Sequence, residues 1–482
     1  MKKITGHGKT AQTCYLRRTI FLMFLLISIL AACGTAPTAI PTPSETPTLA
    51  PTFTPTPIPT PIRLGDYELL SPEDMRYDLD ELFHRIETTH PDPYAKRPKA
   101  EVDLERQKIY DKLDHPMTMF DYFNKVAPLI VSLGDFHTQV YPPNDIFGEE
   151  FSKEKFIPLE IDFEGQQAFI TFNLSRNPDI PVGSELLTIN NKSFANIQNE
   201  LTRLNPNYNS FSVGLWILNG FVPEYEVEIL HPGEADSVKV TIASLSVAEI
   251  NQNRHSESNS AWEPVTYTKV PDEPIGILTV NTFEEIGPLL TPIFAQIQED
   301  SVTSLTIDIR SNGGGKYGVV DSLMDFLTDK PYKYCSKSYE APFRGYGTGA
   351  PREVACDVIQ PFDAKERFQG KLYVLIGPDT FSAAITFATI LQDYGLATLI
   401  GEETTDTASY CANIVLEGTP LPRTGLRYTL SKTCYVRPSG VFDDDPVIPD
   451  IVVETTIEDQ IAGRDPVLKY TLDMIRSSLQ TP

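Results

Sequence analysis

Apolar and polar residues alternate with different periods along the chain, and these periods divide it into three parts. From residue 66 to 150, apolar residues recur every three or four positions, which predicts amphipathic helices. From 156 to 245, short alternating runs predict a small module rich in β-strands. From 260 to 482, short apolar runs that suit buried strands alternate with helical stretches.

The first part is expected to contain three helices. The first begins at Ser71, a capping residue followed by proline, and it ends at the segment HPDPY, His90–Tyr94. Val102–Leu113 and Thr118–Leu133 continue the helical period. Gly134 is a typical residue for ending the last helix.

The α/β part contains a strand–turn–helix unit. Leu372–Ile376 is predicted to be a buried strand, and a helix rich in small residues begins at Ala383. Ser382 therefore lies at a helix N-terminus, where backbone N–H groups point outward and the helix dipole favours negative charge. It is either a capping serine or a nucleophile that attacks a carbonyl while the Ala383 N–H binds the oxyanion.

A second loop in this part is rich in glycine. The predicted strand Leu305–Ile309 runs into Gly313–Gly315, and such a run lets backbone N–H groups face an anion. A phosphate-binding loop is disfavoured, because the motif spacing is absent and Lys316 is followed by tyrosine. A plain turn remains the alternative.

His137 is the best candidate for a general base among the seven histidines. It follows the helix end at Gly134, lies between small and polar residues, and has Asp135 two positions before it. Histidine titrates near neutral pH and can accept the proton of a serine hydroxyl. The other six histidines lie in the leader or in helix, turn, loop and pre-proline contexts.

The N-terminus has the order of a secretory signal. Basic residues precede the apolar run Thr19–Leu30, and small residues then lead to Cys33. Residues 1–33 are thus predicted to be a lipoprotein signal peptide whose Cys33 is lipidated. An ordinary signal peptide or an uncleaved anchor would also export the chain. Residues 34–65 form a Thr/Pro-rich linker that cannot build a core.

Charge and cysteine content narrow the classes of function. The formal charge is −25; residues 1–62 hold five basic residues and one acid, a contribution of +4, so the remainder carries −29. A body this acidic is a poor nucleic-acid binder. Four cysteines lie outside the predicted signal peptide of residues 1–33. In an exported chain they can form two disulfides, for which the local pairings are Cys335–Cys356 and Cys411–Cys434. No C-x-x-C spacing indicates a zinc site.

Four segments resemble one peptidase family in order and spacing. They are DIRSNGGG (308–315), TFSAAITFA (380–388), LIGEET (399–404) and LGDFHT (133–138). Together they resemble the tail-specific, or C-terminal-processing, serine peptidases, and HPDPY is similar to the branch related to the tricorn core protease. The resemblance implies a crotonase-like α/β core over 260–482, an N-terminal helical domain over 66–150 and a PDZ-like module over 156–245.

The resemblance also implies roles for site residues. Ser382 matches the nucleophile, and the oxyanion hole matches the Ala383 N–H with the N–H of Gly314 or Gly313. One branch of the family uses a lysine downstream of the serine, but this chain has Thr407 and Cys411 there. The tricorn-like branch uses a histidine, which matches His137.

Two positions depart from that branch. Its serine before the histidine is Phe136 here, and its late glutamate falls in the segment DDDPVIPD. Asp443 occupies the matching position, and Asp444 is a competitor for the same role. Aspartate is shorter than glutamate by one methylene.

These patterns predict an exported serine peptidase, anchored by lipid in a bacterial cell envelope outside the cytoplasm. Its partners are a peptide or protein substrate and the membrane, without nucleic acid, and its chemistry needs no metal or organic cofactor. A serine esterase is one alternative, although the G-x-S-x-G elbow is absent. A non-catalytic peptide-binding lipoprotein of the same fold is the other.

Overall fold

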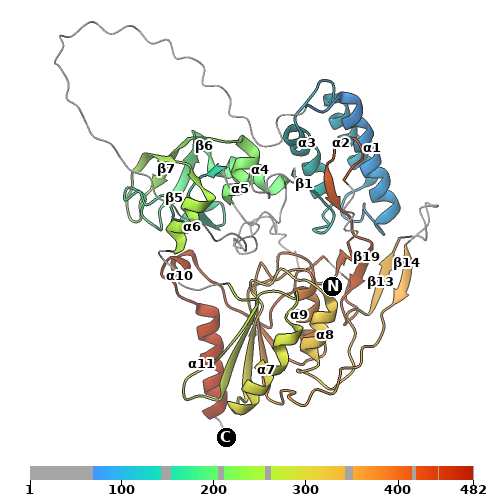
Figure 1. Cartoon of the computed structure of the whole chain (residues 1–482), viewed down its shortest axis with the longest axis vertical. Coiled ribbons are helices and arrows are strands. Elements are labelled where there is room, and N and C mark those ends of the chain that lie inside the picture. Colours follow the sequence, from blue (N-terminus) through green and yellow to red (C-terminus); the bar gives the residue numbers. More distant parts are fainter. Residues whose placement is uncertain are drawn as a thin grey trace, which may run out of the picture.

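The computed structural model describes residues 69–142, 154–204, 211–255, 262–341, 351–414, 420–442 and 444–480 (Figure 1). The predicted lipidation site Cys33, the linker and Asp443 lie outside these ranges. Within the described ranges, no helix combines the length and apolar character that a membrane crossing requires.

Three helices form the first part: α1 (Pro72–Thr89), α2 (Lys99–Lys112) and α3 (Met119–Val131). The side chain of Ser71 caps α1 by accepting the Asp74 N–H, and Thr118 caps α3 in the same way. Their apolar faces share one core, which also includes Trp216 and Leu426 from distant parts of the chain.

Hydrogen bonds attach these helices to residues 423–429, which follow Ser382 in the sequence. Buried Asp78 of α1 accepts hydrogen bonds from the Thr424 N–H (2.5 Å), the Thr424 hydroxyl (2.7 Å) and the Arg423 N–H (3.1 Å). Strand β1 (Gln139–Tyr141) pairs with β18 (Arg427–Thr429) in antiparallel orientation. The segment that carries His137 is therefore held against the C-terminal part.

The middle part is an antiparallel sheet with short helices. Its strand order is β3 (Leu159–Glu164), β4 (Gln167–Asn173), β5 (Glu185–Ile189), β7 (Glu224–Leu230) and β8 (Ser237–Ala243), with β6 (Lys192–Ser193) paired to β5. Helices α4 (Phe194–Leu204) and α5 (Phe211–Asn219) share its apolar core. Strands β2 (Lys155–Phe156) and β9 (Leu245–Ser246) pair beside it, followed by α6 (Val247–His255). The alternating runs predicted a module rich in strands, and the structure adds the helices α4, α5 and α6 to these strands.

The last part contains a mostly parallel sheet. Its order is β10 (Val265–Lys269), β11 (Ile275–Val280), β12 (Ser304–Asp308), β15 (Lys371–Ile376), β16 (Thr398–Gly401) and β20 (Ile451–Val452). Only the pair β10–β11 is antiparallel. Helices α7 (Gly287–Glu299), α8 (Tyr317–Met324) and α9 (Ala383–Asp393) cover one face, and α11 (Pro466–Gln480) covers the other (Figure 1). The result is a three-layer α/β/α domain, with the short helix α10 (Ile457–Ile461) before α11.

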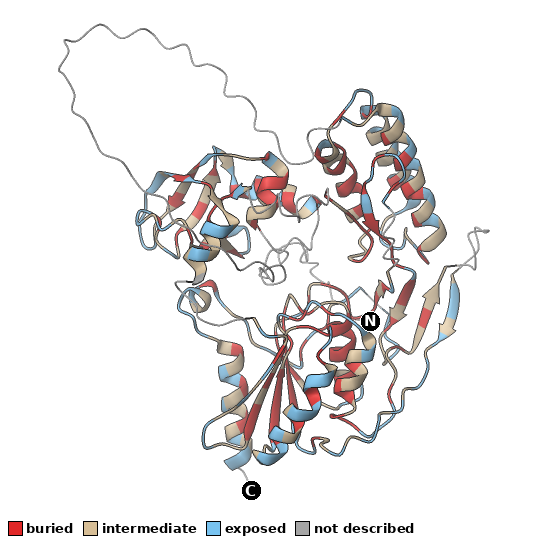
Figure 2. Ribbon diagram, in the orientation of Figure 1, coloured by how far each residue is buried: buried red, intermediate tan, exposed pale blue. Residues whose placement is uncertain are grey.

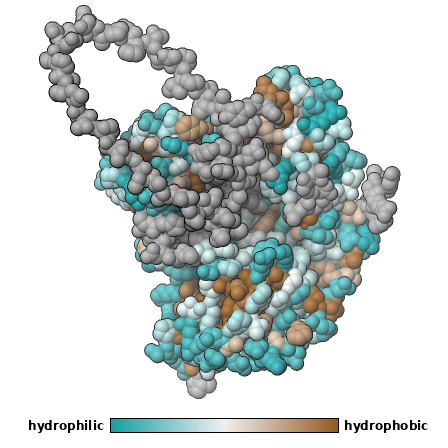
Figure 3. All heavy atoms as spheres, viewed as in Figure 1, coloured by the Kyte–Doolittle hydropathy of each residue, from teal (hydrophilic) through white to brown (hydrophobic). Residues whose placement is uncertain are grey.

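Helix α9 is the most deeply buried helix of this domain: residues 383–391 are all buried, and buried residues concentrate along the sheet beside it (Figure 2). The visible surface is mostly hydrophilic, with apolar side chains gathered in the lower part of the view, over the α/β domain (Figure 3). A helix in this position is held rigidly, which is what a reactive group at its N-terminus requires.

A smaller antiparallel sheet flanks the domain, in the order β14 (Arg352–Ala355), β13 (Lys337–Glu340), β19 (Thr433–Val436) and β17 (Tyr410–Ala412). The structure pairs Cys335 with Cys356 and Cys411 with Cys434, the two local pairings expected from the sequence. The second disulfide joins β17 to β19, close to the candidate site.

Candidate active site

Ser382 lies on the sharp turn between β15 and α9. Its backbone has φ 55° and ψ −121°, a left-handed conformation that non-glycine residues rarely adopt. The turn is fixed because the Thr380 hydroxyl accepts the Gly377 N–H and donates to the Ile309 carbonyl. Although Ser382 is at the N-cap position, its side chain makes no capping hydrogen bond. The capping interpretation is therefore wrong, and a strained backbone of this kind is a recurring feature of functional sites.

The glycine-rich loop after β12 packs directly against this turn. A Cβ at Gly314 would lie 2.7 Å from Ser382 Cβ and 3.0 Å from the Ala383 nitrogen, so no side chain fits there. Buried Asn312 holds the loop: its carbonyl accepts the Phe381 N–H (3.0 Å) and its side-chain amide donates to Val280 (3.0 Å). The plain-turn interpretation misses this close approach of the two segments.

The two expected oxyanion donors differ in their surroundings. Among the described residues, the Ala383 N–H has no hydrogen-bond partner, so it is free to bind an anion. The Gly314 N–H donates to Asn312 Oδ1 at 2.8 Å and is occupied in this conformation. Gly313 on the same loop is exposed, and its N–H has no partner within the described part of the chain.

His137 lies between α3 and β1, on a segment held by several hydrogen bonds. Asp135 accepts the His137 N–H through Oδ1 (3.0 Å) and contacts His90 Nε2 through Oδ2 (3.1 Å). Because His90 Nδ1 accepts the Asp92 N–H, neutral His90 carries its proton on Nε2 and donates it to Asp135. The HPDPY segment thus positions the backbone of His137.

These contacts also set the ionisation of Asp135. Burial raises the pKa of the Asp135 carboxyl, but the hydrogen bond from His90, together with the charges that His90 and His137 carry when protonated, outweighs burial, and the pKa falls to about 2. Asp135 is therefore negative near the His137 ring. Burial nevertheless lowers the pKa of His137, against the smaller raising effect of Asp135.

The imidazole of His137 lies beside the Ser382 turn. Its ring stacks on Phe381, with centroids 4.6 Å apart and planes 14° apart, and on Tyr410 at 5.6 Å. The Tyr410 hydroxyl donates to the Ser382 carbonyl at 2.9 Å. Both ring nitrogens are buried without a hydrogen-bond partner among the described residues, so the ring does not contact the Ser382 hydroxyl in this conformation.

A carboxylate absent from the sequence-based site faces this ring. Asp406, on the turn after β16, is buried, and its Oδ2 lies 3.9 Å from His137 Nδ1. Its Oδ1 accepts the Thr407 N–H at 2.8 Å. The only sequence signal was that aspartate stands where the family resemblance leads one to expect glycine, after the GEETT run.

The other candidates for acid and base lie elsewhere or are not described. Asp443 is outside the described residues, and the side chain of Asp444 is 78% exposed beside Lys96 Nζ at 3.3 Å. Lys316, an alternative base, pairs on the surface with Glu284 at 2.8 Å. Of the described candidates, His137 alone contacts a residue of the Ser382 turn through its side chain.

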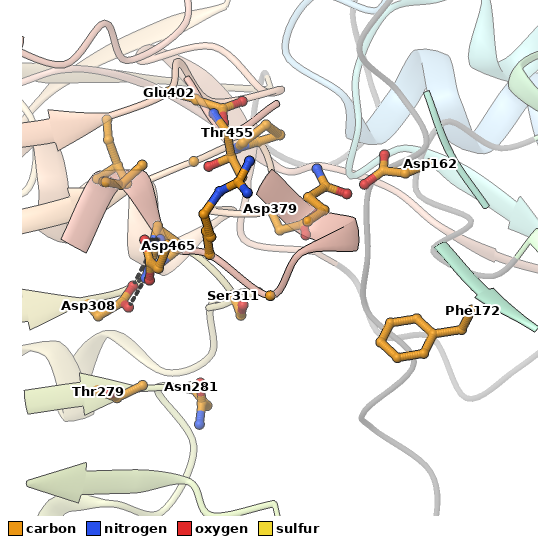
Figure 4. A pocket seen from close by; sticks show the side chains of 18 residues that line it. Asp162, Phe172, Thr279, Asn281, Asp308, Ser311, Asp379, Glu402, Thr455 and Asp465 are labelled. Carbon is orange, nitrogen blue, oxygen red and sulfur yellow. Dashed lines mark hydrogen bonds and ion pairs between the residues drawn. The ribbon is translucent and has the colours of Figure 1, made fainter. Parts of the chain in front are cut away.

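Two cavities flank the site. One of about 390 Å³ lies beside Asp406, Tyr410 and Phe136, and its wall is mainly apolar. The other, of about 410 Å³, lies at the C-terminal ends of the parallel strands (Figure 4). Ser311 and Asp379 line it from the two loops that build the site, while Phe172 lines it from β4.

One group in the described ranges offers three atoms suited to a metal ion: His90, Cys411 and Cys434. The two sulfurs are joined in a disulfide, and both His90 nitrogens are engaged in hydrogen bonds. A metal ligand needs a free lone pair, so these residues do not fit a metal in this state.

Similarity to known proteins agrees with this geometry. The family "Peptidase family S41" matches residues 274–453, which include Ser382, the glycine-rich loop and Asp406. The tail-specific protease of Haemophilus influenzae is 26% identical over 178 residues, which cover 35% of this chain and 23% of that protein. The match thus spans about a quarter of the length of this curated relative.

Solved structures show a shared fold. Mature CPAF complexed with lactacystin aligns with a TM-score of 0.59 at 16% identity, covering 85% of this chain and 98% of that one. Mature CPAF alone aligns with a TM-score of 0.57 at 16% identity, covering 81% and 94%. The predicted resemblance to tail-specific peptidases is confirmed: residues 274–453 match the serine peptidase family S41.

Proposed function

We propose that this chain is an exported serine peptidase that hydrolyses peptide bonds through an acyl-enzyme on Ser382. One observation carries the proposal: Ser382 is held at φ 55° on a helix N-terminus, makes no capping bond, and adjoins the Ala383 N–H, which has no partner in the described part of the chain. A serine that only capped the helix would use its hydroxyl on the helix backbone. Here the hydroxyl is left for another partner.

His137 is the base in this proposal. A serine hydroxyl is a weak nucleophile until a neighbouring base takes its proton, and neutral imidazole does so near pH 7. Burial favours the neutral form of His137 by lowering its pKa. The hydrogen bond to Ser382 has to form on substrate binding, by a shift of the ring along Phe381, and such contacts are often long without substrate.

The reaction then follows serine acyl transfer. Ser382 Oγ attacks the peptide carbonyl, and its proton passes to His137. The tetrahedral oxyanion is bound by the Ala383 N–H and by a donor from Gly313–Gly315. His137 returns the proton to the leaving amine, and water repeats the sequence on the acyl-enzyme.

Gly313 is the more suitable second donor. The Gly314 N–H, expected from the sequence, is bound to Asn312 Oδ1 and would have to break that bond. The Gly313 N–H is free among the described residues. The reaction is the same whichever of the two glycines donates the second hydrogen bond to the oxyanion, because both N–H groups belong to the loop that packs against Ser382.

A serine-directed phosphonate tests the proposal. The probe should attach covalently to Ser382, and the labelled protein should lose peptide hydrolysis in proportion to labelling. Turnover of peptides with little turnover of matched esters supports a peptidase over an esterase. An unlabelled, correctly folded protein without turnover would instead support the non-catalytic peptide-binding alternative.

The proposal extends to the organisation of the chain. Residues 260–482 act as a crotonase-like catalytic core, 66–150 as a helical domain that supplies His137, and 156–245 as a PDZ-like module. Cys33 attaches the chain to the membrane of a bacterial envelope, and residues 34–65 hold the folded part away from the lipid. The signal-like order of residues 1–33 supports this location.

The module is proposed to present the C-terminal tail of a substrate. It faces the core across the cavity of Figure 4, at the strand ends where ligands of open α/β sheets bind. PDZ modules bind a peptide as an added strand and hold its terminal carboxylate with backbone N–H groups. A peptide bound there would reach Ser382 past Ser311 and Asp379.

Identical peptides with a free and an amidated C-terminus test this role. Amidation should raise KM several-fold and leave kcat nearly unchanged, because the lost contact is remote from the reacting bond. Equal kinetics for both peptides would remove the proposed role of the module and leave an endopeptidase that acts through Ser382.

A further inference from the structure

Two buried polar groups face each other without a hydrogen bond. Asp406 Oδ2 and both ring nitrogens of His137 have no partner among the described residues, and Oδ2 lies 3.9 Å from Nδ1. The side chains of both residues are less than a tenth exposed, so bulk water does not replace the missing partner. A buried polar atom without a hydrogen bond is costly and usually has a functional reason.

We propose that Asp406 is the carboxylate that positions His137, in place of the acid that the family resemblance assigns to Asp443. The inference rests on the proposed function. A shift of about 1 Å brings Oδ2 within the usual hydrogen-bond distance of Nδ1 and satisfies both groups. Asp406 acts through His137 and does not touch the substrate.

The hydrogen bond would set the tautomer of the imidazole. With the proton on Nδ1 and donated to Asp406, the lone pair lies on Nε2 and can accept the proton of the Ser382 hydroxyl. When His137 becomes an imidazolium, the Asp406 carboxylate stabilises its charge. The proton moves from Ser382 Oγ to Nε2 and returns to the leaving amine, so Asp406 gains none.

The surrounding charges agree with a coupled pair. Burial raises the pKa of the Asp406 carboxyl to about 7, opposed by the hydrogen bond from the Thr407 N–H and by the charge of Lys96 and helped by the negative charge of Asp135. Lys96 is itself paired with Asp444, and Asp135 with His90. On the remaining side, Tyr410 is neutral, because burial holds its pKa well above the usual value.

The active form requires Asp406 ionised and His137 neutral. Activity should therefore rise with pH through an apparent pKa near 7 that belongs to the pair. Without the carboxylate, the only titrating group is His137, whose pKa is lowered by burial. The acidic limb of the pH profile should then move to lower pH.

Stability should change in the opposite sense from activity. The Asp406 carboxyl has an ordinary pKa of 3.8 and a pKa of about 7 in the fold, so its stabilising contribution is complete below pH 3.8 and is lost as the pH rises through 7. Asparagine has no such loss. Asp406→Asn should therefore melt at a higher temperature than the parent at pH 8 and at a similar temperature at pH 4.

The experiment compares Asp406→Asn, Asp406→Glu, Asp443→Asn and Asp393→Asn. Asparagine can donate to Nδ1 and impose the wrong tautomer, so Asp406→Asn should lower kcat by roughly 10³-fold or more, with a much smaller change in KM. Asp406→Glu keeps the charge and should recover much of the activity and the limb near pH 7. Asp393 is the matched control, because it is a half-buried residue whose largely covered side chain pairs with Arg437 at 2.6 Å. Its asparagine variant should lower the melting temperature and leave the acidic limb in place.

Distinct results separate this inference from the proposed function. If Asp406→Asn keeps its kcat and its acidic limb while Ser382→Ala is inactive, the role of Asp406 is wrong and the serine mechanism stands. If Asp443→Asn alone shows the loss of kcat and the shifted limb, the family acid is in use and the inference is overturned. Full activity of Ser382→Ala would reject the proposed function itself.

Discussion

Ser382→Ala is expected to lose peptide hydrolysis by on the order of 10³-fold or more while the fold survives. The hydroxyl forms no capping hydrogen bond, so its removal costs the helix little. What the variant loses is the atom that attacks the carbonyl, whereas the Ala383 N–H and the glycine loop remain. Initial rates on a fluorogenic peptide, with circular dichroism as the check on folding, measure the effect.

The matched control for this variant is Ser322→Ala. Ser322 lies on α8, and its hydroxyl donates to the Gly318 carbonyl within the helix. Its loss should leave turnover and phosphonate labelling at the parental level. Undiminished hydrolysis by a folded Ser382→Ala protein would contradict Ser382 as the nucleophile. It would reject both a serine peptidase and a serine esterase that act through this residue.

His137→Ala should be nearly as damaging as the loss of Ser382. Without a base the hydroxyl keeps its proton, so the remaining rate comes from substrate binding and oxyanion stabilisation. Because the two groups act as a unit, the double variant should be no slower than the slower single variant. The kcat values of the two single variants and of the double variant measure this non-additivity directly.

The pH dependence identifies the base. Activity that depends on His137 should be present at neutral pH and lost on acidification, since only neutral imidazole accepts a proton. His84→Ala, which removes an exposed histidine from α1, and Lys316→Ala should both keep the parental profile. A profile that rises only well above pH 8 and disappears in Lys316→Ala or Lys432→Ala would assign the base to lysine instead.

Much of the reactive turn could be predicted because its signals are local. An apolar strand before Gly377, and small residues after Ser382, specify a strand–turn–helix unit through contacts within a few residues. The same holds for the cap at Ser71, whose hydrogen bond joins positions three residues apart. The sequence likewise contained the two local cysteine pairs that the structure joins.

Contacts between distant segments could not be predicted in this way. The Asn312 side chain occupies the Gly314 N–H, and this depends on how the loop folds back against Phe381. The ring of His137 contacts Phe381, and the pairing of β1 with β18 helps to hold the His137 segment beside the C-terminal part. Periodicity reports which face of an element is buried, but it does not report what that face meets.

The sequence by itself determined the nucleophile candidate, the glycine-rich loop, the choice of His137 among seven histidines and the order of helical, strand-rich and α/β parts. Tertiary structure alone decided that Asp406 faces His137 at 3.9 Å, while Asp444 is on the surface with Lys96. The physical reason is that a carboxylate acts on an imidazole through distance and burial, and both depend on the packing of segments far apart in the chain. The residue type at a motif position therefore predicts neither the distance between the two groups nor their burial.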